Sequence, residues 1–193
     1  MSAGARAWWT LTAVLAAGSV LAWWLPSAWL DWQPDAALAE PWRAWTAAWV
    51  HWSPTHLLSN LVAAGVVGAF GWAAQVPREQ AWAWCAAWPL GHAALALEPD
   101  LAHYGGLSGV LHGGVAVVCL WLLLRGRGAR RAVGAAVALG LAIKLVREAP
   151  WGPALQRSED WDIAVAPLAH VAGAAAGLLC AALALILTRH QAA

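Results

Sequence analysis

Residues 105–125 read GGLSGVLHGGVAVVCLWLLLR. Beyond Ser108 this stretch is almost wholly apolar, over a length close to the ~20 residues that a helix needs to cross a bilayer. Ser108 and His112 interrupt it one helical turn apart, and so on the same face. Polar side chains within a membrane span are costly and tend to be functional. The segment therefore predicts a transmembrane helix that carries chemistry in its first turn.

The whole chain has the composition of a membrane protein. Of its 193 residues, 62% are hydrophobic and 11% are charged, whereas a soluble domain carries about 25% charged residues. The net charge of +1 gives no support to nucleic-acid binding. The length predicts one domain, residues 1–193. Three isolated cysteines form neither a disulfide framework nor a zinc motif: Cys85, Cys119 and Cys180.

Six apolar segments approach the length of a membrane span. They cover residues 7–25, 56–74, 80–97, 108–124, 129–146 and 163–187. The first could be taken for a signal peptide, but it lacks a small-residue cleavage site, so we retain it as a span. Residues 26–55 form a long, apolar and Trp-rich loop, which we expect to lie on or in the outer membrane face.

Basic residues set the expected orientation, because cytoplasmic loops carry an excess of Lys and Arg. With the N-terminus inside, seven arginines fall on the inner side: Arg6, Arg78, Arg125, Arg127, Arg130, Arg131 and Arg189. Four basic residues then fall outside: Arg43, Lys144, Arg147 and Arg157. The sequence therefore predicts that both termini lie in the cytoplasm.

Tryptophan is unusually frequent, with 17 residues, and many lie where apolar runs meet polar loops. The indole ring is apolar while its N–H needs a partner, which suits the membrane interface. We expect interfacial anchors at Trp8, Trp9, Trp23, Trp24, Trp29, Trp32, Trp42, Trp45, Trp49 and Trp52. A substrate-gripping role for a few of them is the alternative.

Three polar clusters fall at the outer ends of their spans. His56 and Asn60 share a helix face, and two donors aimed at one point can hold an oxyanion. Interhelical hydrogen bonding is the structural alternative for them. Ser108 has glycines around it at a helix N-terminus, which suits a nucleophile, but a serine N-cap is the alternative.

The third cluster is His170 with the glycines that follow it. Gly173 and Gly177 are four residues apart, a small-xxx-small face that allows close helix contact. That face could bring His170 to Ser108, where imidazole can accept the serine proton. A histidine bonded to a backbone carbonyl is the alternative. His112 could line the cavity, pack on His170 or act as a competing base.

Together these residues resemble the rhomboid family of intramembrane serine proteases. The match covers about residues 41–187 and comprises Trp42-Arg43, His51, His56-x-x-x-Asn60, Gly106-Leu107-Ser108-Gly109 and Ala169-His170-x-x-Gly173-x-x-x-Gly177. The order and the spacing of these motifs agree with the family pattern.

The resemblance implies an all-α membrane protein, a six-transmembrane-helix rhomboid-like bundle. Ser108 and His170 form a catalytic dyad in a cavity that opens to the outer face. The Ser108 backbone N–H, His56 and Asn60 form the oxyanion hole. No metal, organic cofactor or third acid is implied, and we predict none. Residues expected to line or support the cavity are His51, Gly106, Gly109, His112, Gly173, Gly177, Trp42 and Arg43.

The compact size and the sequence GLSGVLHG at residues 106–113 are similar to the bacterial rhombosortase branch, since many other rhomboids carry tyrosine where His112 stands. The branch implies membrane-anchored substrates, namely exported proteins with a C-terminal Gly-Gly sorting segment (GlyGly-CTERM), an apolar helix and basic residues. It also implies a place in the bacterial inner membrane with the active site facing the periplasm. Hydrolysis and transfer of the acyl group to a lipid amine both remain open.

Three other functions compete with proteolysis. A catalytically inactive rhomboid-like protein could bind membrane helices, although such proteins usually lack the serine or the histidine. A histidine-ligated haem or metal protein is permitted by the seven histidines. A small transporter is disfavoured because no pair of broken helices recurs in two halves of the chain.

Overall fold

The computed structural model describes residues 1–190 except 99, 158, 160 and 161. Its long helices are α1 (Ala3–Ala22), α3 (Pro54–Ala73), α4 (Arg78–Ala93, extended by the 3-10 helix η4, Ala94–Leu97), α5 (Ser108–Arg125), α6 (Ala129–Arg147) and α7 (Pro167–His190). Short helices occupy the first loop: η1 (Ser27–Trp29), η2 (Pro34–Ala36), α2 (Arg43–Thr46) and η3 (Ala47–Trp49). The predicted all-α class is confirmed, since the described residues form no strand and only two isolated bridges, Trp32–Tyr104 and Gln156–Val165.

Residues at the helix N-termini explain why α1 and α7 begin at other positions than the spans predicted from hydropathy. The Ser2 hydroxyl accepts from Ala5 N at 3.1 Å, so α1 begins four residues before the predicted span. The last span was expected from residue 163, but α7 begins at Pro167. Proline is favoured in the first turn of a helix because its missing N–H costs nothing there. Val165 instead pairs with Gln156 in a bridge.

Four helices of the described chain are long and apolar enough to cross a membrane: α1, α3, α5 and α7. The other two long helices fall short for different reasons. Helix α4 has 16 residues before its 3-10 extension, and α6 carries Arg130, Arg131, Lys144 and Arg147 in its end turns. Long basic side chains at helix ends can reach the membrane interface, so six spans remain our prediction.

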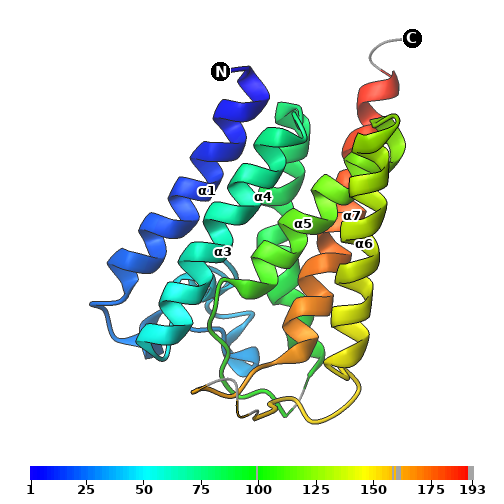
Figure 1. Ribbon diagram of the computed structural model, residues 1–193. Coiled ribbons are helices and arrows are strands. Elements are labelled where there is room, and N and C mark those ends of the chain that lie inside the picture. The colour runs from blue at the N-terminus through cyan, green and yellow to red at the C-terminus, as the bar shows by residue number, and fades with distance from the viewer. Residues whose placement is uncertain (99, 158, 160–161, 191–193) are drawn as a thin grey trace.

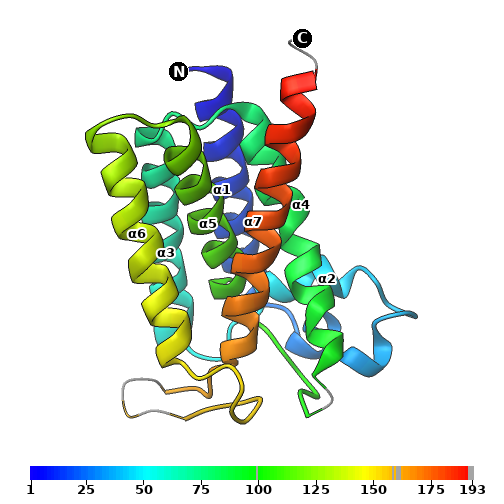
Figure 2. The same ribbon diagram turned by 90° about the vertical axis from the view of Figure 1, so that its right-hand side faces the viewer.

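The long helices run alternately up and down, which places both termini at one end of the bundle (Figure 1). The first loop and the described residues of the loops 98–107 and 148–166 lie together at the opposite end. Helix α5 is central and packs against α3, α4, α6 and α7. Helix α6 lies at the edge (Figure 2), and Gly134 is its only buried residue.

Two tryptophans tie the core together rather than anchoring the membrane surface. Trp8 is 0% exposed and lies 4.4 Å from Trp84 between ring centroids. Trp8 Nε1 donates to Val67 O at 3.0 Å, and Trp84 Nε1 donates to Val110 O at 2.8 Å. The interfacial prediction is therefore wrong for Trp8, and for the buried Trp32. It suits the exposed Trp24, Trp29, Trp42, Trp45 and Trp52.

The first loop is an ordered structure built around Arg43. The buried guanidinium donates to Asp31 O at 2.8 Å and to Asp31 Oδ1 at 3.1 Å, and it also pairs with Glu40. Asp31 Oδ2 lies 2.7 Å from His103 Nδ1. A bridge between Trp32 and Tyr104 joins the same two segments. The loop is thereby fixed to residues 98–107, which lead directly into Ser108.

Candidate active site

Ser108 and His170 meet at the outer ends of α5 and α7. Ser108 Oγ lies 2.8 Å from His170 Nε2, a hydrogen bond between residues 62 positions apart. His170 is 7% exposed and Ser108 is half-buried. A serine hydroxyl within hydrogen-bond distance of an imidazole is the geometry that nucleophilic catalysis requires. The alternative of a histidine bonded to a backbone carbonyl is not what the structure contains.

Glycines make this approach of α5 and α7 possible. A Cβ on Gly173 would lie 1.9 Å from Gly109 O, and one on Gly177 would lie 2.4 Å from Gly113 O. A Cβ on Gly113 in turn would lie 2.9 Å from Gly173 O. The backbones of the two helices are therefore in direct contact, as the small-residue spacing indicates. Any larger residue at these positions would move His170 away from Ser108.

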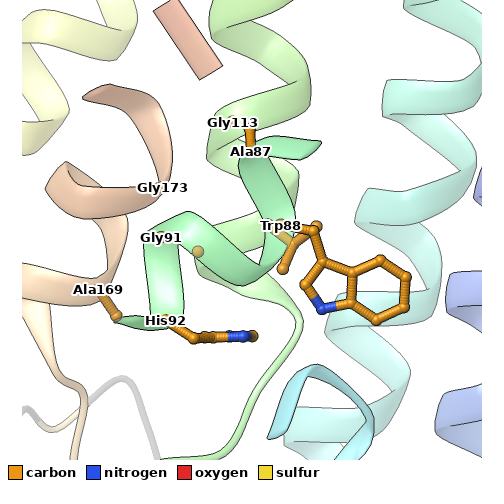
Figure 3. Close-up of a pocket in the computed structure, with 9 residues that line it drawn as sticks. Ala87, Trp88, Gly91, His92, Gly113, Ala169 and Gly173 are labelled. Atoms are coloured by element: carbon orange, nitrogen blue, oxygen red, sulfur yellow. The ribbon is translucent and has the colours of Figure 1, made fainter. Parts of the chain in front are cut away.

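Helix α4 joins the same crossing point (Figure 3). A Cβ on Gly91 would lie 3.1 Å from Gly173 Cα, so three backbones converge at Gly173. The gap that remains has a volume of ≈ 10 Å³, lined by Ala87, Trp88, Gly91, His92, Gly109, Val110, Gly113, Ala169 and Gly173. Such a gap holds about one water molecule at most, so it is a packing feature and not a ligand site.

The backbone before Ser108 is shaped by one glycine and by the chain's only tyrosine. Gly106 has φ +143°, and a Cβ there would lie 3.0 Å from His56 Nε2, so a side chain would be strained and would strike the histidine. Tyr104 Oη donates to Gly106 O at 3.2 Å. Burial raises the pKa of Tyr104 to about 12, although hydrogen bonds with Ser108 and the Gly109 backbone lower it. The phenol therefore stays protonated and holds this turn as a donor.

His56 and Asn60 face the same cavity as Ser108, as their spacing predicts. Trp52 N donates to His56 Nδ1 at 3.4 Å, which places the imidazole proton on Nε2. That N–H is free to donate near Gly106. Asn60 Nδ2 donates to His56 O at 3.1 Å, a bond within α3 and not between helices. The amide keeps a second N–H for a ligand.

His112 packs face to face on His170. The ring centroids are 4.3 Å apart and the planes differ by 14°. His112 Nδ1 lies 2.6 Å from Ser108 O, and because a carbonyl only accepts, Nδ1 carries the proton. His112 also lines the cavity. Of the roles considered from the sequence, this geometry favours cavity lining and packing on His170.

Glu148 completes the surroundings of His170, and sequence reasoning missed it. The residue follows α6 directly, and its Oε2 lies 2.8 Å from His170 Nδ1. In the sequence it is one of several acidic residues of the outer loops, with no spacing that links it to His170. One feature of the sequence pointed to Glu148. It lies two residues after the predicted span 129–146, at the outer end of that span, where the other polar clusters were also predicted.

A cavity of ≈ 530 Å³ contains this constellation. Its walls come from α3, α5, α6 and α7, from Trp52, and from residues 103–105, 155–157 and 163–166 of the loops. Ser108, His170, His56, Asn60, His112 and Glu148 line it, together with the basic residues Lys144, Arg147 and Arg157. The cavity is partly open, and the polar side chains on its wall offer hydrogen-bond partners to water.

Other residues predicted for the site lie outside this cavity. His51 packs against His56 with ring centroids 4.7 Å apart, and its Nδ1 donates to Trp49 O at 3.1 Å. Arg43 organises the first loop, and Trp42 is exposed on that loop. Gly106, Gly109, Gly173 and Gly177 act through close packing, as described above. These residues support the site and do not form its walls.

Comparison with known families identifies the class of protein that this fold and site define. The rhomboid domain model matches residues 38–187, and the chain belongs to the rhomboid family. Members of this family are generally intramembrane serine proteases that act on membrane proteins within the lipid bilayer. The chain is an integral membrane protein. No curated protein sequence matches it.

The haem or metal hypothesis gains no support from the described residues. Across that part of the chain, no three His, Cys, Asp or Glu side chains converge as metal ligands would. His56 and His170, the pair considered for such a role, are engaged instead with Trp52 N and with Ser108 and Glu148.

Proposed function

We propose that this rhomboid is an active serine endopeptidase that cleaves membrane-anchored proteins, with Ser108 as nucleophile and His170 as general base. The contact of 2.8 Å between Ser108 Oγ and His170 Nε2, on the wall of a cavity of ≈ 530 Å³, carries the proposal. Both catalytic side chains are present and bonded to each other. A catalytically inactive rhomboid-like protein that only binds membrane helices would not be expected to keep this arrangement.

The reaction follows from the positions of the donors and acceptors. His170 Nε2 takes the hydroxyl proton while Ser108 Oγ attacks the scissile carbonyl. The oxyanion accepts from the Ser108 N–H, which has no acceptor within the helix, and from His56 Nε2 and Asn60 Nδ2. The C–N bond then breaks, and His170 returns the proton to the leaving amine. Water attacks the acyl-Ser108 ester through the same base to release the acid.

The site lies at the end of the bundle opposite both termini (Figure 1). With both termini in the cytoplasm, as the basic residues favour, the cavity faces the outside, the periplasm of a bacterial inner membrane. All six long helices then form one membrane-spanning domain. A substrate helix must unwind to expose its peptide bond, and glycine lowers the cost of that unwinding.

The activity is tested with a fluorophosphonate probe on the detergent-purified protein. We expect labelling of the wild type, mapped to Ser108 by mass spectrometry, and loss of labelling in Ser108→Ala and in His170→Ala. Ser59→Ala is the matched control, because Ser59 lines the same cavity without being the proposed nucleophile. Folded wild-type protein that does not label would make the inactive helix-binding function the better explanation.

The sequence GLSGVLHG at residues 106–113 supports assignment to the rhombosortase branch. A test substrate would carry a C-terminal Gly-Gly segment, an apolar helix and basic residues. We expect cleavage near the glycines, and much slower cleavage when both are replaced by leucine. Mass spectrometry of the product distinguishes a free acid, from hydrolysis, from an amide formed when a lipid amine intercepts the acyl-enzyme. Equal rates for the two substrates would contradict the branch assignment.

A further inference from the structure

We infer that Glu148 is a positioning residue for His170, so that the site works as a Ser108–His170–Glu148 triad and not as a dyad alone. The inference rests on the proposed function, since it assigns Glu148 a role in that same proton transfer. His170 bonds at both ring nitrogens, with Ser108 Oγ 2.8 Å from Nε2 and Glu148 Oε2 2.8 Å from Nδ1.

The two contacts together fix the tautomer of the imidazole. An ionised carboxylate has no proton to donate, so the Glu148 contact requires the proton of neutral His170 to be on Nδ1. The lone pair is then on Nε2, where it faces the Ser108 hydroxyl. Only this tautomer can accept the serine proton. The carboxylate also favours the imidazolium that forms when the proton is taken.

The local backbone holds Glu148 in this position. It is the C-cap of α6, and the next residue, Ala149, has φ +47°. A left-handed residue at this place ends a helix and reverses the chain. Ala149 N donates to Val146 O at 3.1 Å and Gly152 N donates to Ala149 O at 2.8 Å, which closes the turn. The carboxylate therefore projects from a defined helix end.

Charged neighbours keep Glu148 ionised. Its other oxygen pairs with Lys144, one turn earlier on α6. Burial alone raises the pKa of Glu148, but hydrogen bonds and charge interactions with His170 and Lys144 outweigh it and lower the pKa to about 2. Other titratable or charged groups that face His170 or line its cavity are His112 on α5, His56 on α3, Arg147 on α6, His103 and Tyr104 in the loop before α5, and Arg157 in the loop after α6.

The test measures fluorophosphonate labelling rates against pH for the wild type, Glu148→Gln and Glu148→Asp. The amide of the Glu148→Gln variant can donate to Nδ1, which places the imidazole proton on Nε2. We expect its maximal rate to fall about 10²–10⁴-fold. Glu148→Asp keeps a carboxylate that can accept from Nδ1–H, so we expect part of the rate to return.

Glu98→Gln is the matched control, because it removes another carboxylate from the same end of the bundle. We expect that variant to keep the wild-type rate and profile. Nitrogen-15 NMR of histidine-labelled wild type provides a second test that needs no Glu148 variant. The signal lost in His170→Ala is expected to show a protonated Nδ1.

The outcomes separate this inference from the proposed function. If Glu148→Gln labels at the wild-type rate with the wild-type pH profile, while Ser108→Ala is still not labelled, the role of Glu148 is overturned and the Ser108–His170 dyad stands. A protonated Nε2 in wild-type His170 does the same. Absence of labelling in folded wild type overturns both.

Discussion

Asn60 and His56 lie one helical turn apart, and each has a free donor in the cavity that Ser108 also lines. If they hold the oxyanion, their loss weakens binding of the transition state and not of the substrate. We expect Asn60→Ala to lower kcat about 10²–10³-fold while KM changes little. Ser59→Ala, at the preceding position, serves as the control. An unchanged kcat would mean that Asn60 only caps the carbonyl of His56.

His51 makes stability depend on pH. Burial lowers its pKa to about 4, against an upward contribution from the bond to Trp49 O. Because the folded pKa lies below the unfolded value of 6.5, the unfolded chain binds the proton first as pH falls. The contribution of His51 is therefore complete above pH 6.5 and is lost progressively towards pH 4. Between pH 8 and pH 5 the loss amounts to about 2 kcal/mol.

Thermal unfolding in detergent measures this dependence. The wild type is expected to lose more stability than His51→Gln over the same pH range, whatever the absolute stability of the variant. Parallel pH dependence in the two proteins would show that His51 is accessible to water and protonates in the folded state.

Between elements, the contact of α5 with α7 decides whether the site exists. An alanine methyl at position 173 would lie 1.9 Å from Gly109 O, so the helices must separate. We expect Gly173→Ala to destabilise the protein by about 1–3 kcal/mol and to abolish labelling of Ser108. Gly140→Ala on α6 is the control, since a Cβ there meets nothing within 4 Å. That variant should label normally and be equally or more stable.

The sequence predicts elements better when the signal is local. Apolar runs gave the approximate places of the long helices, and the four-residue spacings placed His56 with Asn60 and Gly173 with Gly177. Glu148 could not be found this way, because its partner lies 22 residues away across a loop. Nor could hydropathy separate the core residue Trp8 from the exposed Trp24, since both lie at ends of one apolar run. The position of Glu148 and the burial of Trp8 both depend on contacts between segments that are distant in the sequence.

For the molecule as a whole, the predicted orientation can be tested by chemical labelling. In a background with Cys85, Cys119 and Cys180 replaced by alanine, Leu38→Cys would report on the first loop and Arg127→Cys on the opposite end. Leu38 is 99% exposed. We expect a membrane-impermeant maleimide to label Leu38→Cys on intact cells, and Arg127→Cys only after the membrane is opened. The reverse pattern would place the cavity in the cytoplasm.

The size of the cavity also limits the number of water molecules that are available to hydrolyse the acyl-enzyme. At ~30 Å³ for each molecule of liquid water, ≈ 530 Å³ corresponds to about 18 molecules. A substrate segment that occupies the cavity displaces part of this water, so fewer molecules remain beside Ser108 and His170. The lifetime of the acyl-enzyme then depends on which small nucleophile still fits beside His170, so the bulk of the substrate itself governs how the ester is resolved.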